Sequence, residues 1–277
     1  MKKTGYCLGE RPDLLTSLEI KPGLRTKIFG QQLQCYTTID STNEEAKRVA
    51  LAGAAEGTVI VAERQERGKG RLGRAWFSPP ELGLWFSLIL RPQIKPAHVS
   101  QLTFVSAVAV CKALRKATGF PVLIKWPNDL LCVDKKICGI LTELSAEADR
   151  INYLVIGIGL NVNQQEKDFP PEIKDTAISL AVVTGHLWQR AEILRYILRE
   201  FEKEYLNYLS IGFSQTLLQW RELNITLGKE VVVSTKEETY TGIAEDINES
   251  GCLLVRKNTG EVVTLLAGDV SLRPKSL

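Results

Sequence analysis

The sequence predicts an α+β fold, in which one large domain is followed by a small β-barrel. Apolar residues recur at helical spacing over 97–117 and 190–209, whereas the apolar runs at 58–62 and 84–90 are typical of strands. After Gly228 the pattern changes, and short strand-like runs follow one another with turn residues between them. Such spacing is typical of a barrel of roughly 50 residues.

The order of the elements follows from capping residues and periodicity. Ser41 and Glu44 have the spacing of a capping box, so we expect a helix to begin there and to end at Gly53. Further strands are expected at 122–126, 137–144 and 153–162 in the large domain and at 230–234, 239–244, 251–256 and 261–266 in the barrel. The charged segment 164–176 contains two prolines and is expected to be a surface loop.

We expect the chain to have three parts. Residues 1–35 are weakly patterned and form a lead-in segment, residues 36–226 form the large domain, and residues 227–277 form the barrel. The length of 277 residues suits one large and one small domain. Hydrophobic residues make up 44% of the chain, which is enough for a sizeable core.

The overall charge gives no reason to expect a nucleic-acid or membrane partner, because the formal net charge is only +3. None of the six cysteines forms a C-x-x-C pair, and His98 and His186 lie far from them, so no zinc site is expected. The cysteines are expected to be reduced and to fill the core. No signal peptide follows Met1, and no run approaches the ~20 apolar residues of a membrane span, so we expect a cytoplasmic protein.

Positive charge concentrates in one glycine-rich segment, 64–74. Its five cations are Arg64, Arg67, Lys69, Arg71 and Arg74, and only Glu66 opposes them. Three glycines allow sharp turns and close approach to a ligand. Backbone amides and arginine side chains suit phosphate or carboxylate oxygens, and the flanking Trp76 suits an apolar part of the ligand. The segment predicts an anion-binding loop in an active site; the alternative is a flexible, solvated basic turn.

Two phosphate-binding motifs share part of this pattern, and their context excludes both. A dinucleotide-binding loop opens a helix and has an acidic residue about 20 positions further on. Here two prolines follow the loop, and Glu81 comes too early. A P-loop needs Lys and then Ser or Thr where Arg74 and Ala75 stand.

Two further clusters point to similar chemistry. Asn128 and Asp129 follow a predicted strand, and Lys136 begins the next apolar run, so a carboxylate and an amine can face the basic loop. A β-turn with a surface ion pair is the alternative. The glycines of GIGLNVN (157–163) indicate that either a ligand or a neighbouring side chain lies against the strand.

Together these motifs resemble those of the biotin–protein ligases. The matching pieces are Ser41-Thr42-Asn43, Gln65 with GKGRLGRAWFSP (68–79), KWPNDL (125–130), KKICGIL (135–141) and GIGLNVN (157–163). The resemblance runs from about residue 36 to the end of the chain. It implies a mixed-sheet catalytic domain that binds biotin and ATP and is similar to class II aminoacyl-tRNA synthetases, followed by an SH3-like barrel.

The resemblance also implies a two-step reaction. The carboxylate of biotin attacks the α-phosphorus of ATP with Mg²⁺, which gives biotinyl-5′-AMP and pyrophosphate. A specific lysine of a biotin carboxyl carrier protein, such as the acetyl-CoA carboxylase subunit, then attacks the mixed anhydride and releases AMP. The adenylate hydrolyses readily, so a closing loop that excludes water suits this chemistry.

The family's functional roles fall on residues of these motifs. The resemblance implies that biotin is bound by Ser41, Thr42, Asn43, Gln65, Lys69, Gly70, Arg71 and Lys136. It implies that ATP and the adenylate are bound by Gly68, Lys69, Arg71, Arg74, Trp76, Asn128 and Asn161. The implied catalytic residues are Lys136, which bridges acyl and phosphate oxygens, Asp129, which orients the incoming lysine, and Arg71. No metal ligand is identified, and Mg²⁺ is expected to arrive on the ATP phosphates.

Two features depart from the family's usual pattern. Lys69 stands where the family usually has Arg, and Lys cannot make the bidentate contact of a guanidinium. Some members carry an N-terminal helix-turn-helix repressor domain, and residues 1–35 resemble the linker that follows it. We therefore expect a linker remnant and no sequence-specific DNA binding. The resemblance implies homodimers formed through sheet edges, and a monomer is the alternative.

Two other functions fit parts of the sequence. A lipoate–protein ligase shares the fold and the adenylation chemistry, but KWPND together with GKGRLGR favours biotin. A nucleic-acid-binding module would use the basic loop, but the small net charge and the lack of a basic stripe beyond that loop argue against it.

Overall fold

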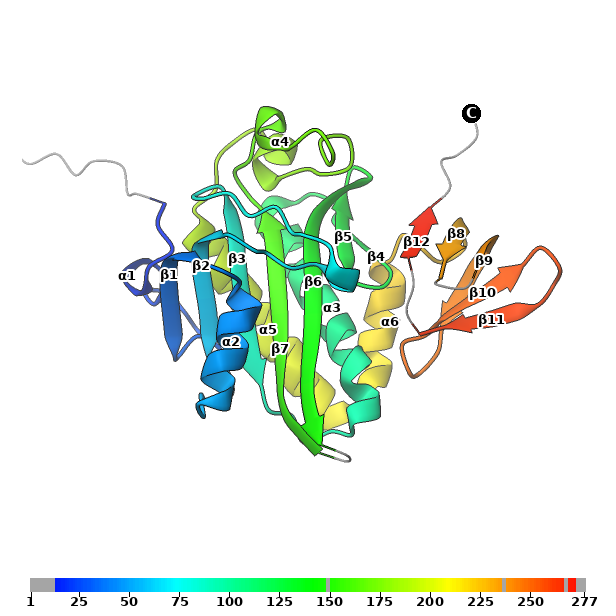
Figure 1. Cartoon of the computed structure of the whole chain (residues 1–277), viewed down its shortest axis with the longest axis horizontal. Coiled ribbons are helices and arrows are strands. Elements are labelled where there is room, and N and C mark those ends of the chain that lie inside the picture. Colours follow the sequence, from blue (N-terminus) through cyan, green and yellow to red (C-terminus); the bar gives the residue numbers. More distant parts are fainter. Residues whose placement is uncertain (1–12, 148–149, 236–237, 267–268, 273–277) are drawn as a thin grey trace, which may run out of the picture.

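A seven-stranded mixed sheet forms the centre of the computed structural model, which describes residues 13–147, 150–235, 238–266 and 269–272 (Figure 1). Its strands are β1 (Leu33–Ile39), β2 (Val59–Gln65), β3 (Gly83–Leu90), β4 (Leu123–Lys125), β5 (Asp129–Cys132), β6 (Lys135–Glu147) and β7 (Arg150–Asn161). The strand order is β1-β2-β3-β7-β6-β5-β4. β1 runs parallel to β2, and every other pair of neighbours is antiparallel.

Helices cover both faces of this sheet (Figure 1). They are α1 (Ser17–Ile20), α2 (Thr42–Leu51), α3 (Val99–Thr118), α4 (Leu180–Thr184), α5 (Arg190–Ile211) and α6 (Phe213–Leu223). α2 lies on one face, against β2, β3 and β7, while α3 and α5 pack against each other on the opposite face. Because both faces are covered, β3 is buried along all eight of its residues.

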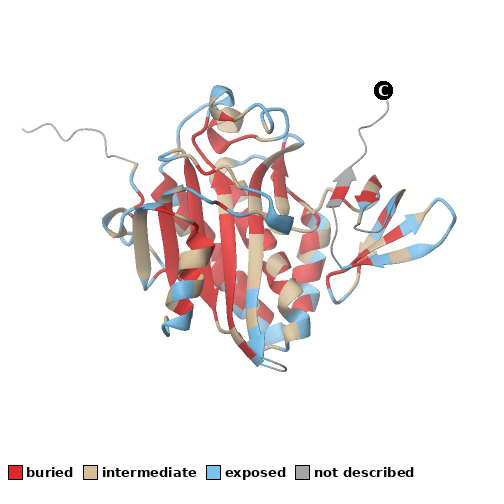
Figure 2. Cartoon of the chain, in the orientation of Figure 1, coloured by how far each residue is buried: buried red, intermediate tan, exposed pale blue. Residues whose placement is uncertain are grey.

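The core lies between the sheet and the pair α3–α5, and Figure 2 shows it as buried residues along the central strands and these helices. Leu102, Val105, Ala109 and Leu114, whose spacing predicted α3, are all buried. The segment Pro96–Thr118 is long and apolar enough to span a membrane, but 67% of its most apolar window is buried inside the protein. Its composition is therefore that of a core helix.

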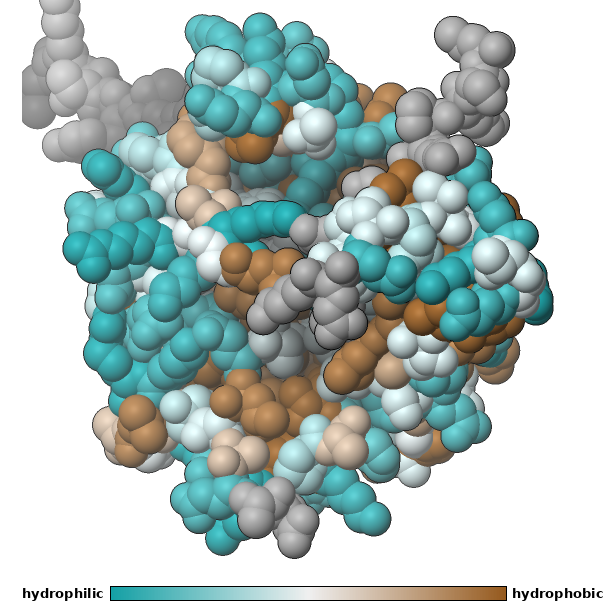
Figure 3. All heavy atoms as spheres, turned by 45° about the vertical axis from the view of Figure 1, so that its right-hand side comes forward, coloured by the Kyte–Doolittle hydropathy of each residue, from teal (hydrophilic) through white to brown (hydrophobic). Residues whose placement is uncertain are grey.

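The C-terminal domain is a five-stranded antiparallel sheet. Its strands are β8 (Glu230–Ser234), β9 (Thr239–Ile247), β10 (Leu253–Lys257), β11 (Val262–Leu265) and β12 (Asp269–Leu272), in the order β11-β10-β9-β8-β12. The turn before β10 attaches this domain to the large one. Trp126 Nε1 donates to the Gly251 carbonyl (3.3 Å), and Gln101 Nε2 donates to the Glu249 carbonyl (2.9 Å). Figure 3 shows this side of the molecule, where hydrophobic residues gather in the middle of the face and hydrophilic residues surround them.

The predicted α+β architecture is confirmed, but individual elements differ from the prediction. Six of these elements were not predicted from the sequence: the strands β1, β5 and β12, each of seven residues or fewer, the short helices α1 and α4, and the helix α6. The expected capping box is wrong. Ser41 occupies the N-cap position of α2 without a side-chain cap hydrogen bond, and Glu44 pairs with Lys47 and Lys69 instead.

The segment expected to be a lead-in packs on the large domain from residue 13 onward. Leu15 and Phe29 are buried in the main core. The fully buried Arg190 holds the start of the segment, because its Nε donates to Asp13 Oδ2 at 2.7 Å. Residues 1–12 lie outside the described part of the chain.

Candidate active site

A cavity of about 920 Å³ lies over the glycines of β6 and β7. The start of α2, the glycine-rich loop, the turn between β4 and β5, and the segment after β7 bound it. All of the predicted binding and catalytic residues except Gly68 line it, namely Ser41, Thr42, Asn43, Gln65, Lys69, Gly70, Arg71, Arg74, Trp76, Asn128, Asp129, Lys136 and Asn161. The structure thus brings together motifs that lie up to 120 positions apart (161 − 41) in the sequence.

The start of α2 forms one polar wall of the cavity. The backbone N–H and the Oγ1 of Thr42 both donate to Gln65 Oε1, at 2.8 and 3.0 Å. Gln65 Nε2 donates to Ser78 Oγ at 2.9 Å, so both ends of this amide have assigned partners. Ser41 is buried beside Thr42, and its hydroxyl does not cap the helix. This wall therefore presents polar groups of fixed orientation to the cavity.

Asn43 extends the polar wall towards the sheet. Its Oδ1 accepts a hydrogen bond from Ser87 Oγ (2.6 Å), and its Nδ2 donates to Glu143 Oε2 (2.7 Å). Gly157 makes room for this arrangement, because a Cβ there would lie 2.0 Å from Asn43 Oδ1. Asn43 is thus held by β3, β6 and β7 together.

The glycine-rich loop is a short hairpin and not the start of a helix. The Trp76 N–H donates to the Gly68 carbonyl (2.8 Å), and the Gly70 N–H donates to the Arg74 carbonyl (2.7 Å). A 3₁₀ turn, Arg71–Gly73, closes its tip. A Cβ on Gly68 would lie 2.5 Å from the Trp76 carbonyl oxygen. Gly68 therefore lets the two arms of the hairpin approach each other, and it does not line the cavity.

Trp76 packs over Gly139 of β6 and Gly159 of β7. A Cβ at these positions would lie 2.9 Å from Trp76 Cζ3 and 2.4 Å from Trp76 Nε1, respectively. The indole Nε1 is buried and has no hydrogen-bond partner among the described residues. Lys136 Nζ lies 5.1 Å from the ring centroid, within cation–π range. Among the described residues, the strand glycines therefore make room for neighbouring side chains.

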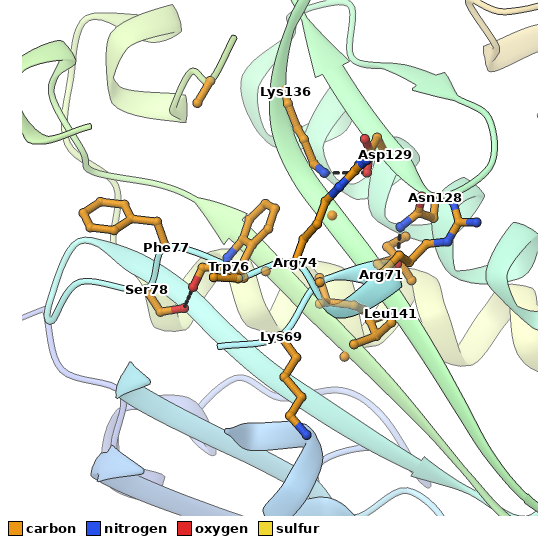
Figure 4. Close-up of a pocket in the computed structure, with 18 of the residues that line it drawn as sticks. Lys69, Arg71, Arg74, Trp76, Phe77, Ser78, Asn128, Asp129, Lys136 and Leu141 are labelled. Atoms are coloured by element: carbon orange, nitrogen blue, oxygen red, sulfur yellow. Dashed lines mark hydrogen bonds and ion pairs between the residues drawn. The ribbon is translucent and has the colours of Figure 1, made fainter. Parts of the chain in front are cut away.

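Asp129 and Lys136 form an ion pair inside the cavity (Figure 4), with 2.7 Å between Oδ1 and Nζ. The two side chains are 23% and 34% exposed, so the pair is not a fully solvated surface contact. The segment after β7 fixes the backbone of Lys136. The Lys136 N–H donates to the Thr176 carbonyl (2.7 Å), and the Lys136 carbonyl accepts from the Ile178 N–H (2.9 Å). Its amine thus projects from a backbone held on both sides.

Asn128 joins the hairpin to the turn between β4 and β5. Its Oδ1 accepts from Arg71 Nη1 (3.1 Å), while its Nδ2 donates to the Ile140 carbonyl (2.6 Å). In Figure 4 the side chain of Arg74 extends towards the pair of Asp129 and Lys136. Two guanidinium groups and one ammonium group therefore lie at this end of the cavity.

Two of the predicted residues make contacts that their implied roles do not require. Lys69 Nζ lies 2.6 Å from Glu44 Oε1, and Figure 4 shows its side chain directed away from the Asp129–Lys136 pair. Asn161 is 4% exposed, and its Nδ2 donates to the Ile178 carbonyl (3.1 Å). Its amide supports the segment after β7 at the edge of the cavity.

The structure adds lining residues that the sequence did not indicate. They include Pro170, Ile173, Thr176 and Ala177 from the segment after β7, and Ser234 and Val270 from the C-terminal domain. The segment 164–176 is a surface loop as predicted, with one 3₁₀ turn (Glu166–Asp168), but its second half also closes the cavity. The only local feature that favours an ordered loop here is the pair of prolines, because proline restricts the backbone.

The cavity combines a fixed polar wall, an aromatic floor and a cationic end. This arrangement suits a ligand with a polar head, an apolar middle and an anionic group. No cluster of three His, Cys, Asp or Glu residues suited to a metal ion occurs among the described residues.

Comparison with known proteins shows which ligases share this architecture. Residues 35–161 match the model of the biotin/lipoate A/B protein ligase family, and residues 226–273 match the biotin protein ligase C-terminal domain. The chain is 41% identical to the bifunctional ligase/repressor BirA of Bacillus subtilis, over 98% of this chain and 83% of that protein. The chain belongs to the biotin–protein ligase family.

Two other members of the biotin–protein ligase family match over most of their length. The biotin–[acetyl-CoA-carboxylase] ligase of Paracoccus denitrificans is 33% identical, over 81% of this chain and 94% of that protein. The structure of the biotin protein ligase from Aquifex aeolicus in complex with biotin and ATP is 34% identical, with a TM-score of 0.77 over 88% of this chain and 99% of that chain. These matches confirm the predicted family and its fold, a synthetase-like catalytic domain followed by an SH3-like domain.

Proposed function

We propose that this protein is an ATP-dependent ligase that activates biotin as biotinyl-5′-AMP and transfers it to a lysine of a biotin carboxyl carrier protein. One observation carries the proposal: a single cavity holds the polar wall at Ser41 and Thr42 and the cations Arg71, Arg74 and Lys136. Relatives named as biotin–[acetyl-CoA-carboxylase] ligases and a neighbour solved with biotin and ATP support the choice of substrates.

In the first step, a carboxylate oxygen of biotin attacks the α-phosphorus of ATP. A new P–O bond forms, and the bond to pyrophosphate breaks. Two anions must approach each other, and Arg71, Arg74 and Lys136 offset their repulsion. Lys136 projects between the hairpin and β5, where it can bridge the acyl and phosphate oxygens as negative charge builds on the pentavalent centre. Trp76 covers the apolar chain of biotin.

In the second step, the amine of the acceptor lysine attacks the acyl carbon of the adenylate. A C–N bond forms, the C–O bond to the phosphate breaks, AMP leaves, and the nitrogen loses a proton. Asp129 lines the same cavity and forms an ion pair with Lys136, so its carboxylate can also bind and orient an incoming ammonium group. A carboxylate is a weak base at neutral pH, which favours an orienting role for Asp129.

Mg²⁺ is proposed as a companion of ATP. The described residues contain no cluster of three potential metal ligands, and Asp129 is already paired with Lys136. They do not fit an ion held by the protein alone, so the metal is assigned to the nucleotide phosphates.

The other partner assignments stay predictions. Light scattering tests the prediction of a homodimer. A gel-shift at physiological salt tests the prediction that the protein does not bind DNA sequence-specifically, and tight binding to an operator would contradict it. The five cysteines within the described residues are all unpaired, which supports a reducing compartment such as the cytoplasm.

Pyrophosphate release on mixing the protein with ATP and biotin tests the proposed function. We expect release with biotin and none with lipoate, and a carrier domain added next should gain the biotinyl group on one lysine. Turnover with lipoate alone would favour a lipoate–protein ligase. No turnover with biotin contradicts the proposal.

A further inference from the structure

Lys69 belongs to the first arm of the glycine-rich hairpin, but its charge lies apart from the other cations. The pairing of the arms places Lys69 opposite Ala75. Side chains alternate along paired arms, so Lys69 projects from the opposite face to Arg74 and Trp76. Figure 4 shows this, since the ammonium group of Lys69 points away from Arg74 and towards α2. There it meets Glu44, with 2.6 Å between Nζ and Oε1.

Glu44 is itself held in place. It lies in the first turn of α2, and its Oε1 is 2.9 Å from Lys47 Nζ. Lys47 pairs in turn with Glu143 on β6, which also accepts the hydrogen bond from Asn43. Hydrogen bonds from Lys69 and then Lys47 hold the pKa of Glu44 below its ordinary value of 4.5, so it is ionised at neutral pH. A continuous chain of charges therefore runs from the cavity wall to the hairpin.

The hairpin has a second attachment on the other side of the cavity. At its tip, Arg71 donates to Asn128 at 3.1 Å. The hairpin therefore bridges the cavity from α2 to the turn between β4 and β5. Loss of either attachment should let one end of this bridge open.

We propose that Lys69 and Glu44 form a tether that positions the hairpin over the cavity, and that Lys69 does not itself bind the biotin carboxylate or the phosphate. The inference rests on the proposed ligase function, because part of its test follows the adenylate. It accounts for Lys69 at a position where the family usually has Arg, since one ammonium group suffices to pair with one carboxylate. Both residues are positioning residues.

A double-mutant cycle tests the tether with Glu44→Gln, Lys69→Gln and the double variant. Glu45→Gln is the matched control, because Glu45 is the next residue of the same helix and contacts Tyr36 and Arg48 instead of the hairpin. Two readouts are needed: AMP released without acceptor, and the rate of tryptic cleavage after Arg71 and Arg74 without ligands. We expect each single variant to raise both by about two- to fivefold, the range that a partly exposed ion pair supplies.

In the same cycle, we expect AMP release and tryptic cleavage of the double variant to equal those of either single variant. The KM for biotin should stay within about twofold of the wild-type value in all three variants, and the Glu45→Gln control should match the wild type. Additive effects of the two substitutions would contradict the tether. Tryptic cleavage does not depend on turnover. If the wild-type protein releases no pyrophosphate, the proposed function is contradicted. The cleavage rates would still test the tether.

A charge-reversed pair, Glu44→Lys with Lys69→Glu, separates a tether from an anion ligand. The pair is made in a Lys47→Gln background, because Lys47 also pairs with Glu44 and would repel a lysine at position 44. The tether needs only opposite charges, so the pair should bring AMP release and cleavage back towards the rates of Lys47→Gln alone. An anion ligand at Lys69 would give another pattern: Lys69→Gln raises the KM for biotin about tenfold or more, Glu44→Gln lowers it, and the reversed pair is worst. That pattern would overturn the inference.

Discussion

The amide oxygen of Asn43 fills the place that a side chain at position 157 would take, since a Cβ on Gly157 would lie 2.0 Å from Asn43 Oδ1. Asn43 belongs to α2, and Gly157 belongs to β7. Ser87 and Glu143 hold the same amide from β3 and β6. Gly157 is therefore required by a side chain of α2, and the polar wall of the cavity packs directly against β7.

Gly157→Ala is expected to lower the free energy of unfolding by about 1–3 kcal/mol, because overpacking forces Asn43 or β7 to move. The KM for biotin should rise more than kcat falls, because the polar wall shifts while the cationic end does not. Urea unfolding and steady-state pyrophosphate release measure the two effects. Asn43→Ala supplies the control, since it removes the atom that clashes. Gly157→Ala should cost much less stability in that background, and an equal cost in both backgrounds would show that Asn43 is not the obstruction.

Much of this site could be predicted because its chemistry is carried by short motifs. The cations of the hairpin, the Asp129 carboxylate and Lys136 are marked by unusual local composition, and thirteen of the predicted residues line one cavity. The resemblance to a ligase family then implied their roles, which local composition alone does not give. The Asp129–Lys136 pair shows the limit of prediction from local composition, because the sequence of these residues is also compatible with a β-turn that carries a surface ion pair.

The other residues of the site depend on tertiary packing, which no local sequence pattern indicates. Thr176 lies at the cavity because its carbonyl accepts a hydrogen bond from the backbone N–H of Lys136. Val270 lies there because the C-terminal domain packs beside β4. The capping box failed for a similar reason: Glu44 has the right spacing, but ion pairs with Lys47 and Lys69 hold it elsewhere. Sequence spacing permits a contact, and competing partners decide whether it forms.

Lys136→Ala is expected to slow adenylate formation by roughly 100-fold while it changes biotin affinity much less, because the amine acts on charge that develops in the transition state. Single-turnover pyrophosphate release at saturating biotin and ATP measures the first effect, and calorimetric titration with biotin measures the second. Lys135→Ala is the matched control, since it removes the same charge one position outside the cavity lining. Equal losses in rate and affinity would show that Lys136 is only a binding contact.

Burial should make two of the cysteines unreactive in the native protein. Desolvation raises the pKa of Cys111 to about 12 and also raises the pKa of Cys138. A raised pKa keeps the thiol protonated at pH 8, and the reactive thiolate forms only as the pH approaches the pKa. A thiol reagent at pH 8 should therefore label both residues only after unfolding, whereas the half-buried Cys35 should label slowly in the native state. Peptide mass spectrometry reads the labels, and native labelling of Cys138 at pH 8 would contradict the prediction.

Arg71→Ala is expected to raise the AMP released without acceptor by about tenfold or more, because it removes both a charge beside the adenylate and the contact to Asn128 that holds the hairpin tip. Asn128→Ala separates these causes, since it keeps the guanidinium and loses the contact, so it should give a smaller increase. Arg67→Ala is the control for charge, because Arg67 is exposed and does not line the cavity. AMP release that stays at the wild-type level in Arg71→Ala would count against the hairpin as a lid, and an increase in Arg67→Ala as large as that in Arg71→Ala would assign the effect to charge alone.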